Sequence, residues 1–89
     1  MSKNSDAAEV QFLRDWCLTV ANLILEGTGR YDAYVRPIEM AGSRGDLKGL
    51  RVAAKDLTEW ANGLQPAHRT RIDEQLRHKY GRGLSSEDT

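Results

Sequence analysis

The clearest pattern of apolar and polar positions lies near the beginning of the chain. Apolar residues recur there at steps of three and four, the spacing that places side chains on one face of a helix. The five positions are Val10, Leu13, Cys17, Val20 and Ile24. Asp6 and Glu9 precede the stripe in the order that is typical of a helix start. The pattern predicts a helix from Asp6 to Glu26, preceded by a disordered segment at residues 1–5.

This predicted helix has an unusually broad apolar surface, because Phe12, Trp16 and Leu23 widen the stripe onto an adjacent face. A surface of that width needs more than one partner helix to cover it. A chain of 89 residues buries only about 60–65% of the surface that its unfolded form exposes. Self-association is a common way to cover what remains. The sequence therefore predicts a homodimer formed through the first helix.

Residues 28–45 fit two patterns. The spacing of Tyr31, Val35 and Ile38 follows the helical period, whereas the same stretch also alternates in the way of a short strand. Pro37 removes a backbone donor and disfavours helical dihedral angles at the residue before it. A broken or kinked helix is the favoured interpretation, because no second strand is visible that could pair with a first.

Turn signals divide the rest of the chain into two further helices. A loop is expected at residues 42–45, after which Asp46 caps a helix that ends at Asn62. Pro66 then opens a last helix, which Gly81 ends. The apolar face of the first of these two helices consists of Leu47, Leu50, Ala54, Leu57 and Ala61. The narrower stripe of the second consists of Ile72, Leu76 and Tyr80.

Together these elements predict an all-α fold, a compact bundle of three to four helices. Hydrophobic residues make up 39% of the chain and charged residues 29%, which is typical of a globular protein. We expect a single helical domain over residues 6–81. Residues 82–89 show no pattern and are expected to form a disordered tail.

Residues that commonly carry catalysis or bind metals are few. The two histidines, His68 and His78, lie on the last predicted helix, about 15 Å apart along its axis, too far to share a metal ion. The single cysteine, Cys17, lies in the middle of the apolar stripe, where a thiol behaves as a small buried hydrophobe. The sequence therefore predicts no catalytic residue, no metal site and no cofactor, and a protein that is not an enzyme.

Charge is balanced over the whole chain, but its distribution is uneven. The 13 basic side chains equal the 13 acidic ones, yet eleven basic and seven acidic residues fall between positions 27 and 84. One face of the helix after Asp46 carries three basic residues, Lys48, Arg51 and Lys55. Arg44, in the loop before this helix, extends the stripe. Such a stripe can contact phosphates. A DNA-binding regulator is therefore the alternative function, acting through this stripe or as a ribbon-helix-helix dimer with residues 30–36 as the ribbon.

The favoured function rests on a second group of residues. Tyr31 and Tyr34 lie beside Arg30 and Arg36, and Tyr and Arg are enriched at protein interfaces. We expect these four residues to contact a protein partner. The sequence thus predicts a small non-enzymatic regulator, inhibitor or adaptor. Neither an apolar span nor a secretory signal is visible, so a cytoplasmic protein that does not bind membranes is expected.

Overall fold

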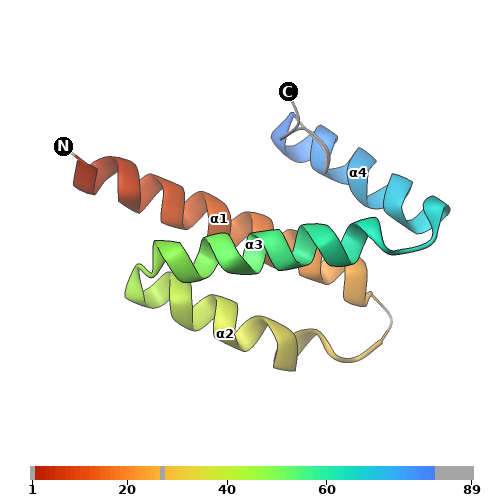
Figure 1. Cartoon of the computed structure of the whole chain (residues 1–89), viewed down its shortest axis with the longest axis horizontal. Coiled ribbons are helices and arrows are strands. Elements are labelled where there is room, and N and C mark those ends of the chain that lie inside the picture. Colours follow the sequence, from red (N-terminus) through yellow and green to blue (C-terminus); the bar gives the residue numbers. More distant parts are fainter. Residues whose placement is uncertain (1, 27, 82–89) are drawn as a thin grey trace. The chain divides into compact units, whose positions relative to one another are not determined.

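The chain folds into four helices in the computed structural model, which describes residues 2–26 and 28–81 (Figure 1). The helices are α1 (Ser2–Leu25), α2 (Tyr31–Arg44), α3 (Leu47–Asn62) and α4 (Pro66–Tyr80). No strand occurs within the described residues. The predicted all-α class is therefore confirmed, while the homodimer stays a prediction.

Backbone contacts group the helices into two units whose boundary lies within α3. Unit 1 extends to Leu57 and contains α1, α2 and most of α3. Unit 2 begins at Thr58 and contains the end of α3 together with α4. The single domain expected over residues 6–81 stays a prediction, and the predicted tail at residues 82–89 lies outside the described part of the chain.

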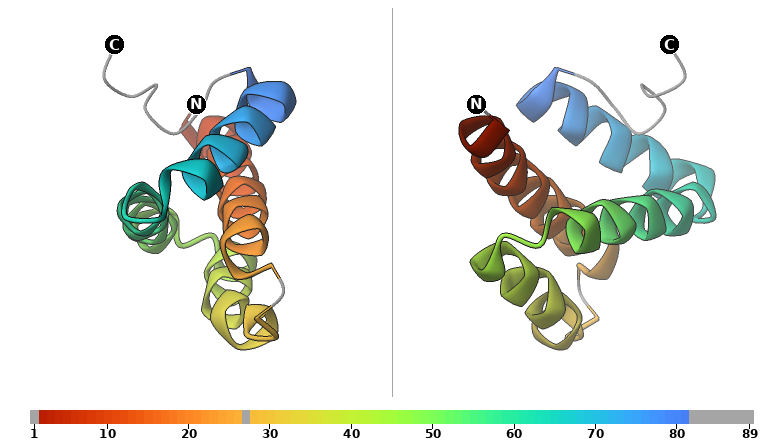
Figure 2. Two further views of the ribbon diagram at one scale, coloured as in Figure 1. Left: turned by 90° about the vertical axis from the view of Figure 1, so that its right-hand side faces the viewer. Right: turned by 60° about the vertical axis from the view of Figure 1, so that its left-hand side comes forward.

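The three helices of unit 1 follow one another up and down, because the chain reverses direction at both connections (Figure 1). Figure 2 shows α2 folding back alongside α1, with which it is in contact. The buried apolar side chains of this unit are Val10, Cys17, Val20, Ala21, Ile24, Leu25, Val35, Ile38, Ala41, Leu50 and Leu57. All three helices therefore contribute to one core.

The apolar stripe of α1 is covered within this one chain more fully than the sequence suggested. Of its five residues Leu13 is half-buried and the other four are buried. Of the residues that widen it, Trp16 and Leu23 are half-buried and Phe12 is 38% exposed. A dimer through α1 is therefore not needed to cover this stripe. The helix also begins earlier than expected, at Ser2, whereas the disorder predicted for residues 1–5 stays a prediction.

Helix α2 resolves the ambiguity of residues 28–45. The helical interpretation is confirmed, but the break expected within it is absent, since residues 31–44 form one helix. The strand alternative is wrong, and the loop expected at residues 42–45 begins only after Arg44. The helix runs through Pro37 without a break. The missing N–H of Pro37 removes the usual donor to the carbonyl of Ala33. Both residues are exposed, so solvent can reach this carbonyl and limit the cost.

The turn between α2 and α3 shows why both helices end where they do. Gly45 adopts a left-handed φ of 69°, and its N–H donates to the carbonyl of Gly42 at 3.2 Å. The N–H of Asp46 donates to the carbonyl of Ala41 at 2.8 Å, which completes a Schellman motif. The Oδ1 of Asp46 then accepts the N–H of Gly49 at 2.9 Å. The predicted cap of α3 is thus confirmed.

Unit 2 follows the sequence signals closely. Helix α4 begins at Pro66, and it ends at Gly81, which has a φ of 82° and donates its N–H to the carbonyl of Arg77 at 2.8 Å. Ile72 and Leu76 of the predicted apolar stripe are fully buried, as expected, whereas its third member, Tyr80, is half-buried. The rest of α4 is mostly exposed, as expected for a helix whose apolar side chains form one narrow stripe.

Candidate partner-binding face on α2

The tyrosines of the predicted partner-binding group lie near the core of unit 1. Tyr31 and Tyr34 are both half-buried. Burial raises the pKa of the Tyr34 hydroxyl, and the nearby Asp56 of α3 and Cys17 of α1 raise it further. Tyr34 therefore lies close to both neighbouring helices. Its position suits a role in packing as much as one in binding.

The two arginines of the same group are exposed, but Arg36 does not share a surface with Tyr34. Arg30 directly precedes α2, and Arg36 lies on the side of α2 that faces solvent. Each residue turns a helix by about 100°, so Arg36 points away from Tyr34 by roughly 160°. The structure therefore divides the four predicted residues between different sides of α2.

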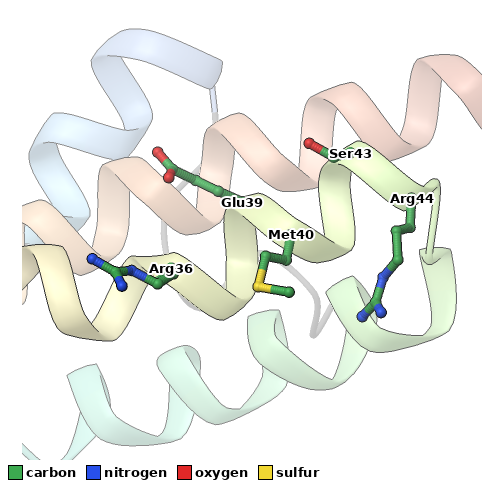
Figure 3. A pocket seen from close by; sticks show the side chains of 5 residues that line it. All are labelled: Arg36, Glu39, Met40, Ser43 and Arg44. Carbon is green, nitrogen blue, oxygen red and sulfur yellow. The ribbon is translucent and has the colours of Figure 1, made fainter.

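Arg36 belongs to a surface that we call the outer face of α2. Its members share the helical spacing of three and four, and all are exposed. They are Arg36, Glu39, Met40, Ser43 and Arg44, and they line an open hollow of about 320 Å³. Figure 3 shows Met40 and Arg44 projecting from one edge of the helix and Glu39 and Ser43 from the other. Arg36 of the predicted partner-binding group and Arg44 of the basic stripe thus lie on the same face.

Met40 lies between these two arginines and was not singled out from the sequence. Arg36 and Arg44 are each four residues from it, so the row spans about 12 Å at 1.5 Å per residue. The Met40 side chain is 53% exposed. Among the described side chains, those of residues 7–26 and 28–81, no carboxylate forms an ion pair with either guanidinium. The row is therefore an apolar group between two cations that are available to a ligand.

The opposite side of α2 holds this face in place. Val35, Ile38 and Ala41 are buried there. Gly42 lies directly against α1, because a Cβ added at this position would lie 2.5 Å from the Cδ of Arg14. The aliphatic part of Arg14 thus covers Gly42. Packing on this side fixes the rotation of α2 and keeps the outer face in solvent.

The basic stripe considered for DNA binding is exposed but partly neutralised. Arg44 ends α2, and Lys48, Arg51 and Lys55 lie on α3. The Nη2 of Arg51 is 2.9 Å from the Oε2 of Glu9 on α1, and its Nε donates to the same oxygen at 3.3 Å. This ion pair offsets positive charge in the middle of the stripe.

The ribbon-helix-helix form of the DNA alternative is wrong. It requires residues 30–36 to pair as strands, whereas residues 31–36 are the beginning of α2. A helix satisfies its backbone hydrogen bonds internally and leaves none for pairing with a second ribbon.

The only cysteine is enclosed in the core of unit 1. Its thiol donates to the carbonyl of Leu50 with 3.9 Å between Sγ and oxygen. Burial raises the pKa of Cys17 to about 12, so the thiol stays protonated at neutral pH, whereas a nucleophile needs the thiolate. In the part of the chain that the structure describes, no three His, Cys, Asp or Glu side chains gather around a metal position. Nor does any helix there combine the length and apolar character needed to cross a bilayer.

Comparisons with known proteins reveal no relative of this chain, since no family model, curated protein or solved structure matches it. The class that can be stated is therefore structural: an all-α protein of four helices with an exposed cationic and apolar helix face.

Proposed function

We propose that this chain is a small non-enzymatic binding protein, a regulator, inhibitor or adaptor, that contacts a protein partner through the outer face of α2. The observation that carries the proposal is Met40, which is 53% exposed between Arg36 and Arg44. A flexible apolar side chain within a polar rim is the arrangement that binding surfaces use as an anchor.

The mechanism would be steric occupation of the partner's surface. Helix α2 is already formed and is held by its buried side against α1. Binding through its outer face would then require little reordering of the backbone, which lowers the entropic cost of association. No chemical step is needed.

The proposal is tested by comparing two aspartate substitutions of matched exposure. Met40→Asp places a charge within the hollow, whereas Val52→Asp does so on α3, where the side chain is 54% exposed. The tagged full chain and both variants are purified from the cells that produce the protein naturally. We expect one stoichiometric partner with the native chain and with Val52→Asp, and its loss with Met40→Asp. Equal recovery with both variants, given unchanged circular dichroism, would exclude the outer face as the site.

DNA binding through the basic stripe remains the alternative proposal. It is supported by the exposed side chains of Lys48 and Lys55 and weakened by the pairing of Arg51 with Glu9. A labelled duplex should be shifted by the native chain, with a steep dependence on salt, and should be released by Lys48→Glu combined with Lys55→Glu. A chain that shifts no duplex at low salt would remove this alternative.

A further inference from the structure

We propose that the partner presents an acidic amphipathic helix to the outer face of α2, with two carboxylates and an apolar residue placed to meet Arg36, Met40 and Arg44. This inference rests on the proposed function and names the chemistry of the partner at the same site. It follows from the spacing of the row and from the charges around it.

The spacing of the row matches that of a helix lying alongside it. Arg36, Met40 and Arg44 recur every four residues along α2, over about 12 Å. A second helix rises by the same 1.5 Å per residue, so its positions i, i+4 and i+8 can face the three side chains in order. The complementary sequence is acidic at i and i+8 and apolar at i+4.

The charges of the row call for carboxylates. Neither guanidinium of the row is ion-paired with a side chain of residues 7–26 or 28–81, whereas Arg51 and Arg77 are paired with Glu9 and Asp73. A guanidinium binds a carboxylate through two parallel hydrogen bonds, so it selects a planar anion by shape as well as by charge. An acidic partner would therefore supply Arg36 and Arg44 with the kind of ion pair that Arg51 and Arg77 form within the chain.

A second copy of this chain is a poor occupant of the face. The row is palindromic, with an arginine four residues on either side of Met40. A twofold axis through Met40 would bring Arg36 of one copy against Arg44 of the other. Like charges placed opposite one another disfavour association. If the chain dimerises, it must do so through another surface.

A nucleic acid is also a poorer match than an acidic helix. The outer face carries two cations and the carboxylate of Glu39, a net charge of +1, which is little for a continuous line of phosphates. The exposed Met40 would find no apolar surface on a sugar–phosphate backbone. A partner helix with two isolated carboxylates on either side of an apolar residue suits both the charge of the face and the exposed Met40.

The test uses a labelled alanine-based helical peptide that carries Glu at positions i and i+8 and Leu at i+4. A matched peptide has Lys in place of both Glu residues, and a labelled duplex serves as a third probe. Binding to the full chain is measured by fluorescence anisotropy at low salt. We expect the Glu peptide to bind about tenfold more tightly than the Lys peptide, and this preference to shrink as salt is added.

Charge reversal makes the test specific to the row. The combined variant Arg36→Glu and Arg44→Glu should prefer the Lys peptide, whereas Lys48→Glu with Lys55→Glu on α3 should retain the native preference. Equal binding of both peptides, no binding of either, or tighter binding of the duplex would overturn the inference. If Met40→Asp nevertheless abolishes recovery of the natural partner, the proposed function stands and only the chemistry assigned to that partner is wrong.

Discussion

The two sides of α2 differ sharply although one short helix carries both. Ile38 and Met40 are apolar and only two positions apart, yet Ile38 is 4% exposed and Met40 is 53% exposed. Two residues turn a helix by about 200°, so one side chain packs into unit 1 and the other points into solvent. The place of a residue around α2, more than its type, therefore decides whether it supports the fold or is free to bind.

The largest expected effect separates these two residues directly. Ile38→Ala should lower the free energy of unfolding by about 2–4 kcal/mol, because it removes buried methyl groups and leaves a cavity. Met40→Ala should change it by less than about 0.5 kcal/mol, because the side chain is largely solvated. Urea denaturation of both variants measures the difference. Equal losses would mean that the two sides of α2 do not differ as described.

The free energy of unfolding should also depend on pH, because two side chains in and beside the core of unit 1 have raised pKa values. The pKa of Cys17 rises from 9.0 to about 12 in the folded chain, and that of Tyr34 rises as well. Above pH 9 the unfolded chain therefore holds fewer protons than the folded one. The free energy of unfolding should then fall as pH rises, by at most about 1.4 kcal/mol per pH unit from Cys17.

Denaturation curves between pH 8 and about 11 follow this loss. Cys17→Ala serves as the control, since it should flatten the dependence that begins at pH 9. A native chain whose stability does not change across this interval would show that the thiol is accessible to water.

The two glycines at the end of α2 should also differ in how well they tolerate a side chain. Gly45→Ala should cost about 1 kcal/mol, because its φ of 69° strains any residue with a Cβ although nothing lies nearby. Gly42→Ala should be close to neutral. Its new methyl group displaces the flexible side chain of Arg14, and alanine offsets that cost through its higher helix propensity. Thermal unfolding distinguishes the two, and a larger loss at Gly42 would show that Arg14 cannot move aside.

The smallest effects concern exposed charges. Arg51→Gln should cost roughly 0.5 kcal/mol through the loss of its pair with Glu9, a pair that is largely exposed. Arg36→Gln should leave stability almost unchanged, since its guanidinium forms no ion pair with the described residues. A double-mutant cycle with Glu9→Gln isolates the pair energy. A marked loss at Arg36 would indicate an internal partner for the outer face.

The sequence was sufficient wherever a local signal decides the structure. Asp46 caps α3 and Gly81 ends α4 as expected, because a side-chain cap and a left-handed glycine act within a few residues. The extent of α2 could not be predicted in the same way. Pro37 is an unfavourable residue whose cost depends on whether the carbonyl of Ala33 reaches solvent, and that is decided by packing elsewhere.

The candidate site was predicted only in part, for a related reason. Arg30, Tyr31, Tyr34 and Arg36 were grouped because they are close in sequence, but neighbours in a helix point in different directions. The signal that could have revealed the outer face was the repeat of four residues that joins Arg36 and Arg44 through Met40. It becomes meaningful only once residues 31–44 are known to be one helix.

Site-specific photo-crosslinking from the outer face of α2 measures most directly whether this face contacts a partner. A photoreactive amino acid replaces Met40 in one sample and the equally exposed Val52 of α3 in another, and the full chain is irradiated in the cells that produce it. We expect one adduct of defined mass from position 40 and none from position 52. An adduct from position 52 alone, or none from either position, would show that the outer face is not the binding site.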